Sequence, residues 1–318
     1  MKTAFFGTPE FSIPSLLELA NRSDVKLVVT SPDVRRGRGK RVKAPPIKQK
    51  ALELGLRVVQ PYSLRDLEFL SLIAELDLDL GVVVAFGRIL GRRLLRTPRL
   101  GFVNVHASIL PKLRGAAPIN RAIMEGHEVS GVSLMRMRLG LDKGPVYLVE
   151  EFPLRPGETA GSLHDELSAL GASALGEFLK MARDGELPEP RKQDHSQASY
   201  AEKITAEDSK INWDSNASVI DRQIRGLSPR PAAWTSFRGK RLRVLGSELV
   251  PSELVHSELV HKEGSQVPGS LIVEARHPLV CCRDGYVKLL SVQLQGKSMV
   301  SGVDFVNGQR VVPGERLQ

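Results

Sequence analysis

The segment Phe102-Val103-Asn104-Val105-His106 alternates apolar and polar side chains and therefore predicts a short β-strand. Because side chains alternate along a strand, Asn104 and His106 point to one face, and the two valines point into the opposite layer. The strand ends at Ala107-Ser108-Ile109-Leu110-Pro111. Both polar groups are thus expected at a carboxyl edge of the predicted sheet, where open α/β folds bind ligands.

Strand and helix patterns alternate around this segment in the first half of the chain. Short apolar and β-branched runs predict strands at 3–6, 25–30, 80–85 and 102–105. Helical spacing covers 13–20, 47–54 and 64–76, and a long helix is expected at 160–183. The alternation predicts an α/β fold with a Rossmann-like, mostly parallel sheet and flanking helices on both faces.

The carboxyl-terminal part has a different pattern. A polar stretch marked by Pro188 and Pro190 lacks periodicity and predicts a linker. Beyond it, a helix is expected at 216–225 and short strands at 234–237, 242–245, 271–273 and 286–294. We therefore predict a small β-barrel. The expected division is a first domain at 1–188, a linker at 189–206 and a second domain at 207–318.

The charge balance favours an anionic partner such as nucleic acid, because 45 Lys and Arg stand against 36 Asp and Glu in 318 residues, a net charge of +9. The densest basic run is Arg35-Arg36-Gly37-Arg38-Gly39-Lys40-Arg41-Val42-Lys43. It follows the second predicted strand and predicts a mobile loop at the same edge as His106. A solvated surface would explain such a run, but clustered arginine and glycine also suit contact with RNA phosphates.

The apolar runs and the two cysteines argue against a membrane-spanning, secreted or zinc-binding protein. No stretch approaches the length needed to span a bilayer, and the apolar run at the amino terminus is too short for a signal peptide. We therefore expect a cytoplasmic protein. The adjacent Cys281 and Cys282 are unsuited to a mutual disulfide or to a zinc site, which favours buried or edge thiols.

Asn104 and His106 together suit acyl transfer. A side-chain amide can donate to a developing oxyanion, and an imidazole exchanges protons near neutral pH. Asp142, in the glycine-flanked segment Gly140-Leu141-Asp142-Lys143-Gly144, would orient the imidazole if the two lie together. From spacing alone, a structural polar pair at a strand end and an ordinary turn aspartate stay open as alternatives.

Three motifs resemble the folate-dependent formyltransferases, whose pattern is Asn-x-His on a strand, a Ser-Leu-Leu-Pro-like turn and a later Gly-x-Asp-x-Gly loop. Here they are Asn104-Val105-His106, Ser108-Ile109-Leu110-Pro111 and Gly140-Leu141-Asp142-Lys143-Gly144. The resemblance covers nearly the whole chain, from Phe6-Gly7-Thr8-Pro9-Glu10-Phe11 to Ile211-Asn212-Trp213. Within the family, it is closest to the members that formylate methionyl initiator tRNA.

The resemblance implies transfer of a formyl group from 10-formyltetrahydrofolate, a co-substrate, to the amino group of methionyl initiator tRNA, with no metal. It also implies an OB-like barrel that binds tRNA. The implied catalytic residues are Asn104, His106 and Asp142. The implied folate-binding residues are Ser108, Ile109, Leu110 and Pro111, and the implied tRNA-binding residues are Arg35, Arg36, Arg38, Lys40, Arg41 and Lys43. A monomer is the default expectation.

Three other functions fit part of the pattern. A formyltransferase acting on glycinamide ribonucleotide or an amino sugar nucleotide would share the catalytic motifs but would not need the basic run. A non-catalytic RNA-binding protein would need only the charge. A dinucleotide-dependent oxidoreductase is disfavoured, because Gly7-Thr8-Pro9 lacks the Gly-x-Gly-x-x-Gly fingerprint.

Two segments depart from the family pattern. Gly126-His127-Glu128-Val129-Ser130-Gly131 lacks the aspartate and threonine that the family more often shows. Residues 247–261 contain three copies of a Ser-Glu-Leu-Val pentad, which predicts a loop insertion.

Overall fold

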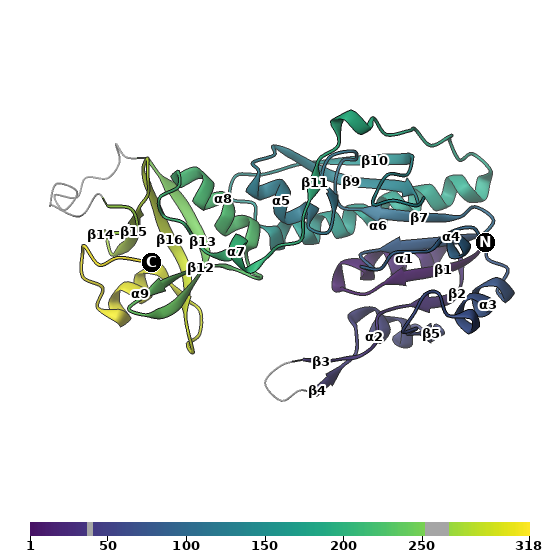
Figure 1. Cartoon of the computed structure of the whole chain (residues 1–318), viewed down its shortest axis with the longest axis horizontal. Helices are drawn as coiled ribbons and strands as arrows, with labels where there is room; N and C mark the ends of the chain where they lie inside the picture. Colours follow the sequence, from purple (N-terminus) through teal and green to yellow (C-terminus); the bar gives the residue numbers. More distant parts are fainter. Residues whose placement is uncertain (37–40, 252–266) are drawn as a thin grey trace. The chain divides into compact units, whose positions relative to one another are not determined.

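The structure is a computed structural model that describes residues 1–36, 41–251 and 267–318 of the chain. These residues form two compact units, each built from separate stretches of sequence (Figure 1). The first unit contains Met1–Pro118, Val129–Pro153 and His164–Glu202, and the second contains Ile119–Glu128, Leu154–Leu163 and Lys203–Gln318. Each unit has its own sheet and its own hydrophobic core.

The first unit is built on a sheet that, within the described ranges, has seven strands in the order β10-β9-β7-β6-β1-β2-β5. The strands from β7 to β5 run parallel, and β9 is antiparallel to both of its neighbours. The predicted Rossmann-like, mostly parallel sheet is therefore confirmed. The strands are β1 (Lys2–Gly7), β2 (Asp24–Val29), β5 (Val58–Val59), β6 (Leu80–Val84), β7 (Phe102–His106), β9 (Val129–Arg136) and β10 (Val146–Pro153).

Packing on the two faces of the sheet fixes the direction of the polar side chains of β7. A Cβ atom on Gly171 of α6 would lie only 2.7 Å from Val105 Cγ1, so Val105 faces that helix. On the other face, Phe102 packs edge-on against Phe6 with ring centroids 5.2 Å apart. Because alternate residues share a face, Asn104 and His106 lie on the Phe102 side. The helices of this part of the chain are α1 (Ile13–Arg22), α2 (Pro46–Glu53), α3 (Leu67–Glu75), α4 (Arg92–Leu95), α5 (Pro118–Met124) and α6 (Ala160–Asp184). Of these, α5 belongs to the second unit from Ile119 onward.

The second unit contains an antiparallel sheet in the order β12-β13-β16-β15-β14, with β17 beside β16. The last residues of the chain join its two edge strands. Gln318 exchanges backbone hydrogen bonds of 2.6 and 3.0 Å with Ser236 of β12, and Leu271 of β14 donates to the Glu315 carbonyl at 2.7 Å. The closure agrees with the predicted barrel. The strands are β12 (Ala233–Phe237), β13 (Lys240–Val250), β14 (Leu271–Glu274), β15 (His277–Cys281), β16 (Tyr286–Leu294) and β17 (Val300–Ser301).

In the described part of Lys203–Gln318, the helices α7 (Ala206–Ser209), α8 (Ala217–Leu227) and α9 (Gly302–Gln309) accompany this sheet. Ile220 and Ile224 of α8 are buried, as is Phe305 of α9, and all three belong to the core of the second unit. The fold class predicted from the sequence, a Rossmann-like, mostly parallel sheet with flanking helices followed by a carboxyl-terminal domain built on an antiparallel sheet, is thus confirmed.

The basic run differs from the predicted loop. β3 (Val34–Arg36) and β4 (Arg41–Lys43) form an antiparallel ladder in which Arg35 pairs with Val42, because two adjacent extended arms satisfy each other's backbone groups. Arg38 and Lys40 lie outside the described residues. We call β3 and β4 together the basic hairpin.

Two further expectations are refined. The first pentad copy forms the end of β13 rather than a loop, since Ser247 to Val250 pair with the long strand β16. Residues 252–261 of the repeat lie outside the described residues. Cys281 and Cys282 are buried free thiols, and burial raises the pKa of Cys282 to about 12. Among the described residues, no helix is both long enough and apolar enough to cross a membrane.

Candidate active site

His106 ends β7 and is almost completely buried, with 6% of its surface exposed. Its Nε2 atom lies 3.1 Å from the Leu113 carbonyl oxygen. Because a carbonyl can only accept, Nε2 is the protonated nitrogen in this contact. The other ring nitrogen, Nδ1, lies 3.8 Å from Asp142 Oδ2. Nε2 therefore has a hydrogen-bond partner, and Nδ1 faces the Asp142 carboxylate at a distance longer than a hydrogen bond.

Asp142 lies in the loop between β9 and β10 and reaches His106 from outside the sheet. Its φ angle of 49° is in the left-handed region, which aspartate tolerates better than most residues. The Gly115 amide donates to Asp142 Oδ2 at 2.9 Å. This hydrogen bond fixes the carboxylate that faces the imidazole. His106 and Asp142, which are 36 positions apart in the chain and were connected only through the family motifs, thus lie next to each other.

Asn104 is half-buried and lies on the same face of β7 as His106. In the strand register it is opposite Met135 of β9 and beside Val83 of β6. The three predicted catalytic residues thus converge on one side of one strand, at its carboxyl end. An amide, an imidazole and a carboxylate in this order can donate to an oxyanion and hold or move a proton.

The turn from Ser108 to Pro111 follows β7 and is tied to β9. The Ser133 hydroxyl donates to the Ser108 carbonyl at 2.7 Å and accepts from the Leu110 amide at 3.0 Å. The Ser108 hydroxyl donates to the Lys112 carbonyl at 2.7 Å, so this donor is used within the turn. Ser108 and Leu110 are buried, whereas Ile109 and Pro111 are half-buried and available for contact.

Three residues beside this cluster were missed by the sequence analysis: Arg114, Gln193 and His195. Arg114 is only 1% exposed, and its guanidinium donates to Gln193 Oε1 at 3.1 and 2.6 Å and to His195 Nδ1 at 2.8 Å. Gln193 and His195 lie in the stretch predicted as a linker, which carries no periodic signal. Only a folded arrangement brings them to the segment after β7.

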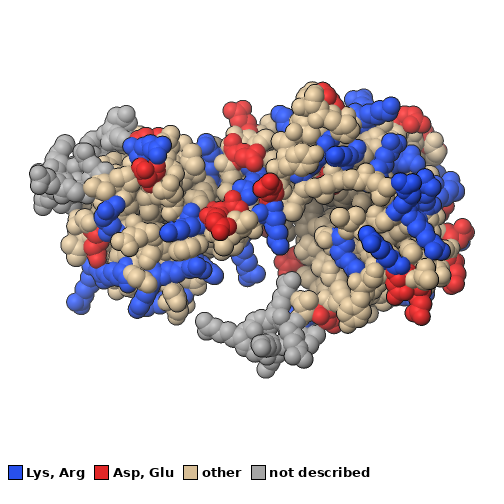
Figure 2. Space-filling model, viewed as in Figure 1, with Lys and Arg blue, Asp and Glu red and all other residues tan. Residues whose placement is uncertain are grey.

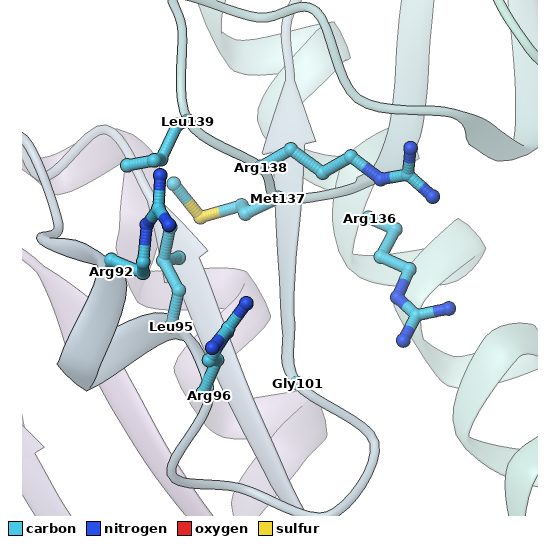
Figure 3. A pocket seen from close by; sticks show the side chains of 8 residues that line it. All are labelled: Arg92, Leu95, Arg96, Gly101, Arg136, Met137, Arg138 and Leu139. Atoms are coloured by element: carbon cyan, nitrogen blue, oxygen red, sulfur yellow. The ribbon is translucent and has the colours of Figure 1, made fainter.

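A hollow of about 540 Å³ opens beside the segment that leads to Asp142 (Figure 3). Its lining includes four arginines and no acidic residue, together with apolar Leu95, Met137 and Leu139. Figure 3 shows guanidinium groups around the opening, contributed by α4 and by the end of β9 and the residues after it. The arginines are Arg92, Arg96, Arg136 and Arg138. An anionic ligand with a flat apolar part would suit this lining.

The basic hairpin is fastened at its base. Asp33, the residue before β3, accepts hydrogen bonds from Lys48 Nζ and Gln60 Nε2, both at 2.7 Å. These bonds, the one from Lys48 first, hold the pKa of Asp33 below its usual value. Lys43, at the end of β4, is exposed. The hairpin therefore starts from a fixed point on the carboxyl side of β2.

Exposed cations also occur on the second unit. Arg241 and Arg243 of β13 are exposed on the outer face of the sheet, and the guanidinium carbon of Arg241 lies 4.1 Å from the ring centroid of Trp234. Figure 2 shows Lys and Arg side chains gathered along the lower border of this unit, and another group over the region of α4 in the first unit.

Comparison with known proteins assigns this combination of fold and site to a class. Residues 1–179 match the family model described as formyl transferase, and residues 203–310 match that of the formyl transferase carboxyl-terminal domain. The chain belongs to the formyltransferase family.

Two relatives match over their full length. The methionyl-tRNA formyltransferase of Sorangium cellulosum is 42% identical, over 99% of this chain and 98% of its own. That of Ruegeria pomeroyi is 42% identical over 100% of both chains. Among solved structures, the N-formyltransferase of Helicobacter canadensis in complex with folinic acid and dTDP-3-aminofucose has a TM-score of 0.68 at 18% identity, over 91% of this chain and 98% of that chain. This last likeness shows the shared fold.

Proposed function

We propose that the chain transfers the formyl group of 10-formyltetrahydrofolate to the α-amino group of methionyl initiator tRNA, giving formylmethionyl-tRNA for translation initiation. The observation that carries this proposal is the convergence of Asn104, His106 and Asp142 at the end of β7, with His106 Nδ1 3.8 Å from Asp142 Oδ2. Full-length relatives named methionyl-tRNA formyltransferase support the choice of substrate.

Each of the three side chains has a distinct part in this reaction. The folate supplies an activated formyl group. The Asn104 amide donates to the formyl oxygen as negative charge develops there during attack by the methionyl amine. His106, in its imidazolium form, stabilises the same charge and donates its proton to the folate nitrogen as the bond between that nitrogen and the formyl carbon breaks; the resulting neutral imidazole then accepts the proton that the amine loses. Asp142 stabilises the imidazolium through its carboxylate, which the Gly115 amide holds in position.

The folate is expected to lie between the turn after β7 and the hollow beside α4. Ile109 and Pro111 offer the contact surface of the turn, while the buried Ser108 and Leu110 shape it. Folate combines flat aromatic rings with carboxylates. The hollow offers both matching chemistries, since Leu95, Met137 and Leu139 are apolar and four arginines surround them. The hollow includes Gly101, which precedes β7, whereas the turn follows it, so a folate that contacts both must extend along the strand.

The tRNA is expected to contact two basic surfaces. We assign the acceptor end to the basic hairpin, through Arg35, Arg36, Arg38, Lys40, Arg41 and Lys43. Residues 207–318 form the proposed tRNA-binding domain, residues 1–188 the catalytic domain, and residues 189–206 the connection between them. The exposed Arg241 and Arg243 of β13 support this role for the second unit. We further propose that the protein is cytoplasmic, because its product, formylmethionyl-tRNA, is used in translation initiation. We also propose that it is a monomer.

The test is formylation by the purified protein with 10-formyltetrahydrofolate. Methionyl initiator tRNA should be formylated, and methionyl elongator tRNA, which differs outside the amino acid, should react far more slowly. A dTDP-linked 3-amino sugar is the third acceptor, because the Helicobacter canadensis structure contains such a ligand. Turnover of the sugar nucleotide without turnover of tRNA would replace the proposed function by formylation of a small amino substrate.

A further inference from the structure

The loop that carries Asp142 is held by a side chain from a distant part of the chain. Gln193 Nε2 donates to the Asp142 carbonyl at 2.8 Å and to the Gly144 carbonyl at 2.6 Å. Asp142 itself has a left-handed backbone with φ of 49°. A non-glycine residue in this region keeps its conformation only when surrounding contacts fix it. The two hydrogen bonds from Gln193 are contacts of that kind.

The orientation of the Gln193 amide is determined on both sides. The two carbonyls of the Asp142 loop can only accept, so the amide nitrogen must face them. On the other side, Oε1 accepts from Arg114 Nε at 3.1 Å and from Arg114 Nη2 at 2.6 Å, and a guanidinium can only donate. All four hydrogen-bonding positions of the amide are thus used, and a flipped amide would lose every one of them.

Arg114 makes this connection stiff. Its side chain is almost fully buried, and its acceptors are the Gln193 oxygen and His195 Nδ1, neither of which is a carboxylate. A buried guanidinium is costly unless its donors are satisfied, so Arg114 holds the Gln193 amide in place. The next residue, Gly115, donates its amide to Asp142 Oδ2 at 2.9 Å. One segment therefore fixes Asp142 twice, directly through Gly115 and indirectly through Gln193.

We propose that Gln193 is a positioning residue for Asp142, held in turn by buried Arg114. It touches no reacting atom. It sets the backbone of the Asp142 loop and hence the distance between Asp142 and His106, now 3.8 Å. The inference rests on the proposed function for its kinetic consequence, but the restraint on the loop is a property of the chain alone.

The decisive variant is Gln193→Glu. A carboxylate still accepts from Arg114, so the buried guanidinium keeps a partner and the fold is expected to be retained. It cannot donate to the Asp142 and Gly144 carbonyls, and it places acceptor against acceptor there. The matched control is Gln197→Glu, which makes the same change of charge at an exposed glutamine whose Nε2 donates only to Asp194 in this part of the structure.

Two readouts are measured for both variants. Hydrogen exchange of the amides in residues 137–145 should become faster in Gln193→Glu and stay unchanged in Gln197→Glu. In formylation of methionyl initiator tRNA, kcat of Gln193→Glu should fall by roughly tenfold or more, as is typical when a partner that orients a reactive group is lost. KM for either substrate should change by less than about threefold, because no substrate contact is removed.

Unchanged exchange in 137–145, or an unchanged kcat in a protein that is active before mutation, would overturn the proposal. If Gln193→Glu did not fold, Gln193→Asn would serve, since it keeps the amide but is one methylene too short to bridge Arg114 and the loop. An active Gln193→Asn with normal exchange would likewise overturn it. Inactivity of the unmodified chain would count against the proposed function alone, because the exchange measurement decides the positioning role without turnover.

Discussion

The end of β7 and the basic hairpin belong to the same unit but are held in opposite ways. His106 is buried, and both of its ring nitrogens face fixed acceptors. The hairpin is fastened at its base through Asp33, and Lys43, which pairs with Val34 at that base, is exposed. Catalysis requires the reacting groups to lie within a few tenths of an ångström of their reactive positions. Electrostatic attraction to phosphates, in contrast, acts over a Debye length of about 8 to 10 Å. The two regions should therefore control different kinetic constants.

The largest effect is expected from His106→Asn. The variant keeps a polar side chain but removes the acid/base group that faces Asp142, so kcat should fall about 10²- to 10⁴-fold with little change in KM. Initial rates of formylation at saturating folate and tRNA measure this. The matched control is His127→Asn, at a histidine paired with Glu125 in the second unit. A loss of similar size in the control would show that the effect is not specific to the end of β7.

Asn104→Ala should be next in size. Loss of one oxyanion donor typically lowers kcat about 10²- to 10³-fold, and the half-buried position leaves the core intact. Asn104→Asp, of the same shape but without the amide donor, should be as severe. If Asn104→Asp retained the activity of the unmodified protein, Asn104 would have no role as a donor.

The sequence predicted those parts of the site whose residues are close together along the chain and missed those that are far apart. Asn104 and His106 share one strand, and a period of two suffices to place them on one face. Only the family motif predicted that Asp142 lies beside these two residues, because the sequence of a loop of this length does not show which residues it will contact. Gln193 and Arg114 could not be found, since their partners are backbone carbonyls and an amide, which leave no pattern of residue types. The expectation of a loop was wrong at 35–36 and 41–43 for the same reason, because these two arms bond to each other through backbone groups.

The hairpin should alter binding rather than turnover. Changing Arg36, Arg41 and Lys43 together to Ala should raise KM for tRNA by roughly tenfold near physiological salt, and should reduce the slope of log KM against log salt by about 2 to 3. KM for folate should stay unchanged. A control that removes three exposed arginines elsewhere in the first unit, Arg57, Arg65 and Arg99, should have a smaller effect on KM for tRNA. Equal effects would show that net charge, rather than the hairpin, attracts the tRNA.

Substitutions in the hollow beside α4 should have a smaller effect, and this effect should be on KM for folate. Arg96→Ala removes one cation from its lining, so KM for 10-formyltetrahydrofolate should rise by roughly three- to tenfold, the range of one charge-assisted hydrogen bond partly screened by solvent. KM for tRNA should not change. Arg99→Ala is the control, because Arg99 is paired with Asp79 and is not among the lining residues. A raised KM for folate in Arg99→Ala, together with an unchanged one in Arg96→Ala, would show that the hollow is not part of the folate site.

The smallest expected effect concerns stability in the second unit. The bidentate Arg121–Asp208 pair, at 2.9 and 3.0 Å, holds the pKa of Asp208 below its usual value, and desolvation only partly offsets this. A carboxylate with a lowered pKa in the folded state contributes stability above its unfolded pKa, about 4, and loses it as pH falls further. Asp208→Asn should cost about 1 to 2 kcal/mol at pH 7 and much less near pH 3. Denaturant unfolding at both pH values checks this, and a pH-independent cost would contradict it.

The most direct test of the contrast between the two regions is one initial-rate experiment with methionyl initiator tRNA and 10-formyltetrahydrofolate. It compares the unmodified protein, His106→Asn and the triple variant at Arg36, Arg41 and Lys43. We expect His106→Asn to lower kcat and to leave KM for tRNA nearly unchanged, and we expect the triple variant to raise that KM and to leave kcat nearly unchanged. A large fall in kcat for the hairpin variant, or full turnover by His106→Asn, would contradict this expectation.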